Sequence, residues 1–104
     1  MKIWLDDKRE MPAGYDYWAK NAYDCIDRLH DSEVAFISFD HDLGSEGKDD
    51  SGLNTGYNVA QWIEAMAFEG SISKIGWEVH SANPVGRRNI ELAMKSAERF
   101  WEGK

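Results

Sequence analysis

Three short apolar runs, each followed at once by a polar residue, restrict the fold of this chain more than any other feature. They are residues 2–5, followed by Asp6, residues 34–39, followed by Asp40, and residues 72–79, followed by His80. Buried strands of a parallel sheet have this pattern, because only their ends meet solvent. Segments with helical periodicity lie between and after the runs. The sequence therefore predicts alternating strands and helices around a mainly parallel sheet.

Capping residues predict where the helices begin and end. The expected helices run from Asn21 to about His30, from Thr55 to Gly70, and from Asn83 onward with Pro84 in the first position. A short edge strand is expected within residues 15–19, and a polar loop within residues 45–54. The predicted class is α/β, with about four strands, helices on both faces of the sheet, and a single domain over residues 1–104.

Composition and charge exclude several classes of function. The chain has 104 residues, 42% of them hydrophobic, and a net charge of −7. This acidity opposes a long electrostatic track along nucleic acid, although a short nucleotide or an RNA end could bind with the help of a metal ion. No leader pattern and no apolar run long enough to cross a membrane is present, so we expect a soluble, cytoplasmic protein. The single cysteine, Cys25, lies on an apolar helix stripe and is expected to be buried.

Asp6, Asp7 and Asp40 are the candidate metal ligands. Neighbouring parallel strands end at the same edge of a sheet, so these acids are expected to converge there. Crowded carboxylates repel one another unless a cation is present, and Mg²⁺ or Mn²⁺ accepts such oxygen ligands. A solvated turn would explain Asp6 and Asp7 alone. Asp40 is the third acid, and it favours a metal site.

His41 and His80 are the candidate groups for proton transfer, together with Asp40. Each histidine adjoins a strand end, and imidazole titrates close enough to neutral pH to serve as general acid or base. The alternative for either one is a structural histidine that is hydrogen-bonded to the backbone.

The candidate phosphate-binding residues surround the same edge. Ser81 and Asn83 lie at the beginning of the last expected helix, where free amides and the helix dipole favour anions. Arg87 in the first turn opposes that dipole, so we expect it to bind an anion, with a salt bridge to a nearby acid as the alternative. The remaining candidates are Thr55, Gly56 and Arg9, for which ordinary loop roles are the alternative.

Several spaced motifs together resemble one known family. They are Trp4-Leu5-Asp6-Asp7-x-Arg9-x-x-Pro12, Ser38-Phe39-Asp40-His41-Asp42-Leu43-Gly44, Thr55-Gly56-Tyr57, and Val79-His80-Ser81-Ala82-Asn83-Pro84-x-Gly86-Arg87. In this order they resemble the cyclic-phosphate-processing receiver-like family, a divergent relative of two-component receiver domains. The resemblance implies a minimal receiver-like, flavodoxin-like, three-layer fold. It also implies that Asp6 and Asp7 take the place of the receiver acidic pair, Asp40 that of the phosphoacceptor, and Ser81 that of the hydroxyl residue.

The resemblance implies processing of cyclic phosphate ends, as in RNA repair or nucleotide-based conflict systems of phages and bacteria. Two departures separate the chain from ordinary receivers: a loop at residues 8–14 replaces the first helix, and the final strand with its lysine has no evident counterpart. Three functions stay open. They are a metal-dependent phosphoesterase, a phosphoacceptor domain in signalling, and a non-catalytic module that binds a nucleotide or a protein.

Overall fold

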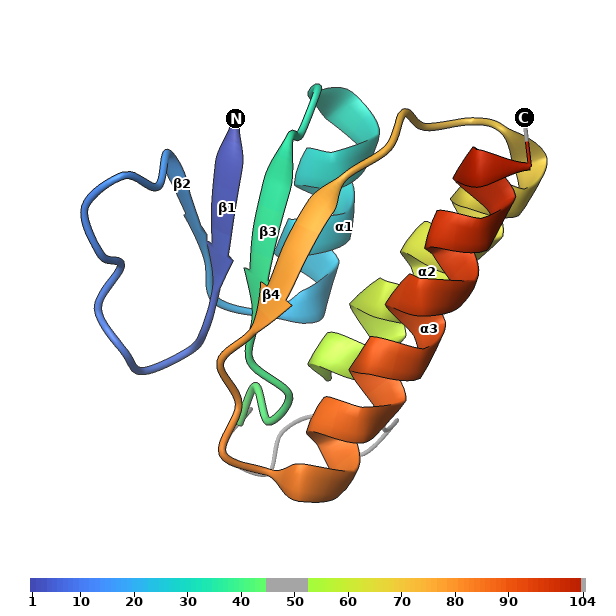
Figure 1. The fold of residues 1–104 in the computed structure, drawn as a ribbon. Coiled ribbons are helices and arrows are strands. Elements are labelled where there is room, and N and C mark those ends of the chain that lie inside the picture. The colour runs from blue at the N-terminus through green and yellow to red at the C-terminus, as the bar shows by residue number, and fades with distance from the viewer. Residues whose placement is uncertain (45–52, 104) are drawn as a thin grey trace.

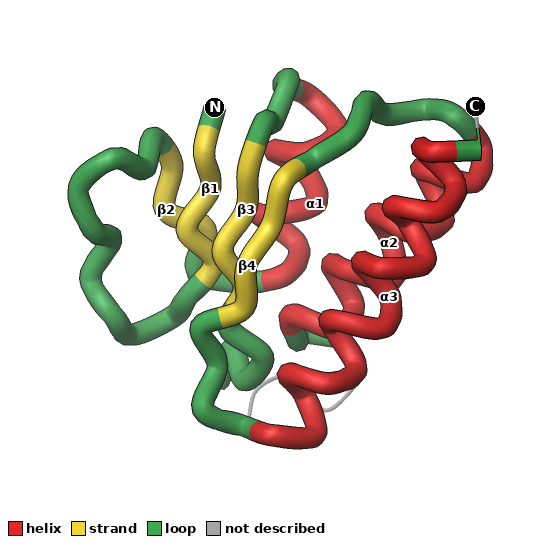
Figure 2. Tube along the Cα trace, viewed as in Figure 1, coloured by secondary structure: helices red, strands yellow, loops and turns green. Residues whose placement is uncertain are grey.

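The computed structural model describes residues 1–44 and 53–103 and has a sheet with helices packed against it (Figure 1). The strands are β1 (Lys2–Leu5), β2 (Tyr17–Ala19), β3 (Phe36–Phe39) and β4 (Gly76–Val79), and the helices are α1 (Ala22–Asp31), α2 (Gly56–Glu69) and α3 (Pro84–Glu102). Figure 2 shows the same elements by type, with the long loop between β1 and β2 at one side of the sheet. No helix in the described part of the chain is long and apolar enough to span a membrane.

The sheet is parallel throughout, with strand order β2-β1-β3-β4. This confirms the predicted α/β class and the number of strands. The pairing aligns Leu5 of β1 with Phe39 of β3, and Phe39 with Val79 of β4. Three neighbouring strands therefore end at the same level. The edge strand β2 and the strands β3 and β4 are each shorter than expected at their amino ends.

The two faces of the sheet differ in chemistry because side chains alternate along each strand. Ile3, Leu5, Ile37 and Phe39 are fully buried in the apolar core beneath the helices. Their neighbours along β1 and β3, among them Trp4 and Ser38, point to the opposite face.

The sequence predicted helices on both faces of the sheet. In the described part of the chain, the helices lie on one face only. The connections from β2 to β3 and from β3 to β4 advance in the same direction across the sheet, and right-handed crossovers of that kind put α1 and α2 on the same face. Helix α2 packs against both α1 and α3. The loop between β1 and β2 covers the other face. It takes the place of the first helix of ordinary receivers.

Tyr15 is the main cover of that second face. Its ring meets the Trp4 ring edge-on at 5.3 Å between centroids, and its hydroxyl donates to Glu78 at 2.9 Å. Lys2 lies over the Tyr15 ring at 4.9 Å. Tyr15 of this loop therefore covers a face of the sheet on which no helix of the described residues lies.

The helix ends agree with the predicted caps. Asn21 accepts a hydrogen bond from the Asp24 amide, and Thr55 accepts one from the Asn58 amide. Gly70 ends α2 in the left-handed conformation, with φ of 74°, which favours glycine. Cys25 is fully buried, as expected, and burial raises the pKa of its thiol. Of the expected polar loop, residues 45–52 lie outside the described residues.

Candidate metal and phosphate site

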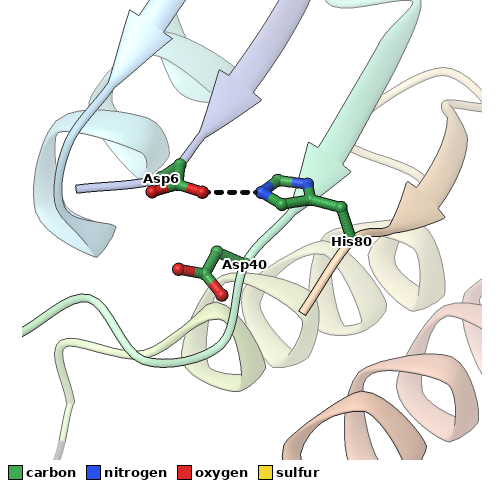
Figure 3. Close-up of side chains that lie close together, drawn as sticks. All are labelled: Asp6, Asp40 and His80. Carbon is green, nitrogen blue, oxygen red and sulfur yellow. Dashed lines mark hydrogen bonds and ion pairs between the residues drawn. The ribbon is translucent and has the colours of Figure 1, made fainter. Parts of the chain in front are cut away.

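Backbone pairing continues one residue beyond the strands and sets three polar residues in a row. The Asp40 amide donates to the Leu5 carbonyl at 2.9 Å, and the His80 amide donates to the Phe39 carbonyl at 2.9 Å. Because side chains alternate, Asp6, Asp40 and His80 turn away from the apolar core and toward one another (Figure 3). One ligand atom from each lies within 4.8 Å of the others, and this is a possible metal-binding group among the described residues.

His80 is held on three sides. Its Nε2 lies 2.9 Å from Asp6 Oδ2, and its Nδ1 lies 2.7 Å from the Ser38 hydroxyl. The imidazole also stacks on the Trp4 indole, with ring centroids 3.9 Å apart and planes 4° from parallel. Both ring nitrogens are therefore engaged with protein groups, and the ring has one well-defined orientation.

Asp6 is buried, with 1% of its surface exposed, and it is fully hydrogen-bonded. Its Oδ1 accepts from the amides of Lys8 and Arg9, each at 2.8 Å. Burial raises the pKa of this carboxyl, but the two amides and His80 outweigh that effect, so the pKa lies below its ordinary value. Asp6 is therefore a carboxylate near neutral pH, which fixes it as the acceptor of its bonds to the two amides and to His80.

Asp40 has the opposite electrostatic character. Burial and the nearby negative charge of Asp6 raise its pKa above the ordinary value, and the hydrogen bond from the His41 amide only partly offsets them. The Arg9 guanidinium lies 3.3 Å from Asp6 and 3.8 Å from Asp40, and so partly balances the two acids. Two crowded carboxylates with one half-exposed cation between them leave the site short of positive charge.

Asp6, Asp40 and Arg9 form part of the wall of a cleft of about 260 Å³ at the carboxyl end of the sheet. The lining combines acids with groups that can donate to an anion: Asp6, Asp7, Lys8, Arg9, Asp40, Asp42, Gly44, Ser81, Ala82 and Asn83. The cleft is open to solvent and joins the ends of β1, β3 and β4. It lies where ligands bind in open parallel sheets.

Comparison with known proteins identifies the family of the chain. Residues 1–96 match the model of the cyclic-phosphate processing receiver domain. The chain belongs to this family. Searches of curated proteins and of solved structures gave no match.

His80 and Ser81 directly follow β4, the strand beside β3 and Asp40. In the register of β3 and β4, the residue that follows Val79 is His80, and Ser81 lies one position beyond it. The Ser81 hydroxyl is buried and accepts from the Asn83 amide at 3.1 Å. His80 is thus level with Asp40, and Ser81, to which the resemblance gives the place of the hydroxyl residue, follows it on the cleft wall.

Asp7 lines the cleft but lies outside the group formed by Asp6, Asp40 and His80. Its Oδ2 points toward Gly44, where an added Cβ would come within 3.3 Å. The two neighbouring acids thus differ: Asp6 is bound into the turn, and Asp7 lies at intermediate exposure on the wall.

His41 and His80, which the sequence had paired as proton carriers, occupy different surroundings. His41 Nδ1 lies 3.0 Å from Asp42 Oδ1, and the hydrogen bond to His41 holds the pKa of Asp42 below its ordinary value. The His41 ring packs so closely on Gly86 that any side chain there would overlap it. His41 is therefore wedged beneath α3 and is not part of the cleft lining.

The remaining expected phosphate ligands have structural partners. Asn83 Oδ1 accepts from the amides of Val85 and Gly86, each at 3.1 Å, so it occupies the amides that were expected to face phosphate. Thr55 caps α2, and the Gly56 amide donates to the His41 carbonyl at 2.9 Å.

Gly56 and Arg87, two further expected phosphate ligands, make structural contacts of different kinds. The backbone of Gly56 lies against the Asp40 carbonyl, so that no Cβ fits there. Arg87 pairs with Glu91 at 3.7 Å on the outside of α3 and does not line the cleft.

Sequence reasoning did not identify Trp4 and Ser38 as parts of this site. A signal was present, because Trp4 precedes Asp6 by two residues and Ser38 precedes Asp40 by two, and residues two apart on a strand share a face. A serine inside an apolar strand is also a polar group that needs a partner when buried. The partner, His80, is 42 residues away in the sequence.

Proposed function

We propose that this receiver domain is a metal-dependent phosphoesterase that processes cyclic phosphates at RNA ends or on nucleotides. One observation carries the proposal: the ligand atoms of Asp6, Asp40 and His80 lie within 4.8 Å of one another, and the two acids of this group line an open cleft. Membership of the cyclic-phosphate processing family supports the class of substrate.

The donor set fits Mg²⁺ or Mn²⁺. A divalent cation at Asp6 and Asp40 would relieve the repulsion that raises the pKa of Asp40. Asp7 offers a further carboxylate on the same wall. Because His80 adds a nitrogen donor, and Mg²⁺ prefers oxygen ligands, we expect Mn²⁺ to bind more tightly than Mg²⁺. When bound, the cation would supply positive charge that polarises a phosphoryl oxygen.

The cleft suits a phosphate end better than a long strand of nucleic acid. Its volume of about 260 Å³ is below the ~300–1,000 Å³ of pockets that enclose a whole drug-sized ligand. Arg9 is half-exposed beside the acids, and Lys8 stands on the same wall, so cationic donors lie near the place where phosphate oxygens would bind. The net charge of −7 opposes binding of a long polyanion outside the cleft.

Of the two histidines, we assign the reaction to His80 and not to His41. His80 adjoins both acids, whereas His41 is held by Asp42 and lies beneath α3. Because His80 belongs to the group whose ligand atoms lie within 4.8 Å of one another, we assign it to completing the metal-binding group and not to the role of general base.

The decisive experiment incubates the protein with Mn²⁺ or Mg²⁺ and a panel of 2′,3′-cyclic nucleotides, 3′,5′-cyclic nucleotides and RNA that ends in a cyclic phosphate. We expect metal-dependent product from at least one substrate. His80→Ala should lower turnover roughly a hundredfold or more. Asp31→Asn, which changes an exposed acid at the other end of the sheet, is the matched control. Tight binding of a substrate with no product from any of them would favour a binding module and would overturn the enzyme.

A second function has one observation in its favour. Asp40 stands in the cleft at the place that the receiver resemblance gives to a phosphoacceptor, next to Asp6 and Arg9. If the chain is a signalling receiver, acetyl phosphate with Mg²⁺ should label Asp40 in equal amount to protein, and His80→Ala should still accept the label. Absence of label in intact-mass measurements would leave the phosphoesterase as the better reading.

A further inference from the structure

Ser38, His80 and Asp6 form a continuous hydrogen-bonded chain from inside the sheet to the cleft. The distances are 2.7 Å from the Ser38 hydroxyl to Nδ1 and 2.9 Å from Nε2 to the Asp6 carboxylate. The three residue types are those of a hydrolase triad, but the ring nitrogens are exchanged, since the hydroxyl bonds Nδ1 and the carboxylate bonds Nε2. Ser38 cannot be the nucleophile, however, because it is fully buried, with 0% of its surface exposed. Its hydroxyl must act on the ring of His80 and not on a substrate.

We propose that Ser38 is a positioning residue for His80, which it holds with Nε2 directed at Asp6 and Asp40. The proposal rests on the proposed function, in that the ring it orients belongs to the metal-binding group. Trp4 has the complementary part, because its indole lies flat against the imidazole and prevents the ring from tilting out of line.

The chemistry of a hydroxyl suits this role. A carboxylate can only accept, so a neutral His80 ring that is bonded to Asp6 carries its proton on Nε2, and the Ser38 hydroxyl then donates to Nδ1. A ring that turned its Nε2 lone pair to a cation would instead carry its proton on Nδ1. The same hydroxyl would then accept, since a serine oxygen does both. Ser38 thus keeps the ring in one orientation in either tautomer.

An outer partner of this kind has a measurable effect on metal sites. Histidine ligands are oriented through the ring nitrogen that does not bind the metal, and removing that partner weakens metal binding roughly 10- to 100-fold. Ser38 has the geometry of such a partner. We therefore expect Ser38→Ala to weaken Mn²⁺ binding by that factor while the fold is retained.

The test combines Mn²⁺ titration with nitrogen NMR of the histidine rings in the metal-free protein. Ser38→Ala should shift the His80 Nδ1 signal toward that of a ring nitrogen without a hydrogen bond, and should lower Mn²⁺ affinity. Ser38→Thr, which restores a hydroxyl, should return both toward the wild type. Ile37→Val is the matched control, because it removes one methyl group from the adjacent strand position on the opposite face and perturbs the core without touching His80.

The outcomes separate the inference from the function on which it rests. Unchanged His80 signals in Ser38→Ala, or an equal loss of Mn²⁺ affinity in Ile37→Val, would overturn the positioning role. If the ring signals respond as expected but Mn²⁺ binds to neither the wild type nor the variants, positioning stands and the metal-dependent function fails. Where Ser38→Thr proves too large to fold, the ring signals of Ser38→Ala alone decide the question.

Discussion

The two ends of the sheet each carry a cavity, and they differ in a way that size does not reveal. The cavity at the amino ends of the strands measures about 520 Å³, twice the 260 Å³ of the cleft at the carboxyl ends. In the larger cavity the side chains of His30 and Asp31 are 75% and 73% exposed and pair with each other at 3.0 Å. In the smaller cleft, Asp6 and Asp40 are 1% and 8% exposed.

The difference teaches that buried charge is a better guide to function than volume. A solvated ion pair contributes little energy and needs no ligand to explain it. A carboxylate held away from water beside a second one is costly, and such an arrangement persists at sites with a purpose. We therefore assign function to the smaller cavity, and the following predictions sharpen or break this assignment, beginning with the largest expected effect.

Replacing Asp6 by Ala should have the largest effect of any single change. The variant removes the acceptor of the Lys8 and Arg9 amides and the partner of His80, so buried donors are left unpaired. We expect a loss of about 1–3 kcal/mol in the free energy of unfolding and Mn²⁺ affinity lowered beyond detection. Urea unfolding and metal titration measure the two effects. Wild-type Mn²⁺ affinity in the variant would remove Asp6 from the metal site.

Asp40→Asn should separate stability from metal binding. Since the folded pKa of Asp40 is raised, its ionisation opposes folding as pH rises through and above the ordinary value. The metal-free variant should therefore melt a few degrees higher than the wild type at pH 7. The gain should vanish in acid, where the wild-type carboxyl is protonated too. Addition of Mn²⁺ should raise the melting temperature of the wild type much more than that of the variant. Equal metal-induced shifts in both would put the ion elsewhere.

Lowering the pH should destabilise the protein through Asp6, because ionisation of Asp6 stabilises the fold whereas ionisation of Asp40 opposes it. Because its folded pKa is depressed, its ionised form stabilises the protein above the ordinary value, and this stability is lost as pH falls through the folded pKa. The wild type should lose stability below pH ~4, where an Asp6→Asn variant, already weakened at neutral pH, should lose less. Parallel acid curves for the two proteins would contradict the lowered pKa.

Arg9→Gln should have a smaller effect, which raises the affinity for a cation and lowers the affinity for an anion. The guanidinium stands 3.3 Å and 3.8 Å from the two acids, where it competes with a metal ion for them. Removing its charge should tighten Mn²⁺ binding several-fold and weaken binding of a nucleoside monophosphate. Calorimetric titrations can measure both. Weaker binding of both ligands would indicate that Arg9 acts only by holding the loop.

Changes at the other end of the sheet should have the smallest effect. Asp31→Asn and His30→Ala alter two exposed side chains that pair with each other. Stability should change by less than about 0.5 kcal/mol, and metal binding not at all. A loss of Mn²⁺ affinity in either variant would break the comparison between the two cavities.

The sequence was sufficient for the parallel sheet and for the helix caps, because those depend on local patterns. Asp40 and His80 could be placed at one edge, since each directly follows a strand. The position of the helices could not be predicted in this way. It depends on strand order, and only the order shows that both crossovers advance in the same direction and leave one face to a loop.

Within the site, residue type was predictable and residue partner was not. His41 and His80 look equivalent in the sequence, each beside a strand end, yet contacts with Gly86 and Asp42 direct one ring under α3. Asn83 was correctly expected to cap α3, and that same capping bond occupies the amides once expected to face phosphate. Whether these amides bond to a cap or to a ligand depends on distances in the folded protein, and the spacing of residues along the sequence does not give those distances.

The loop that covers the second face of the sheet also forms one wall of the cleft. Its amides fix Asp6, its Arg9 carbonyl accepts from the Trp4 indole, and its Tyr15 shields the strands. In evolutionary terms, the support of Asp6 and the cover of the second face are inherited through one segment. A lineage that altered the loop around Tyr15 would also uncover the Trp4 ring that Tyr15 contacts, so changes in the cleft are expected to arise through Lys8 and Asn83 on its wall, while Tyr15 stays unchanged.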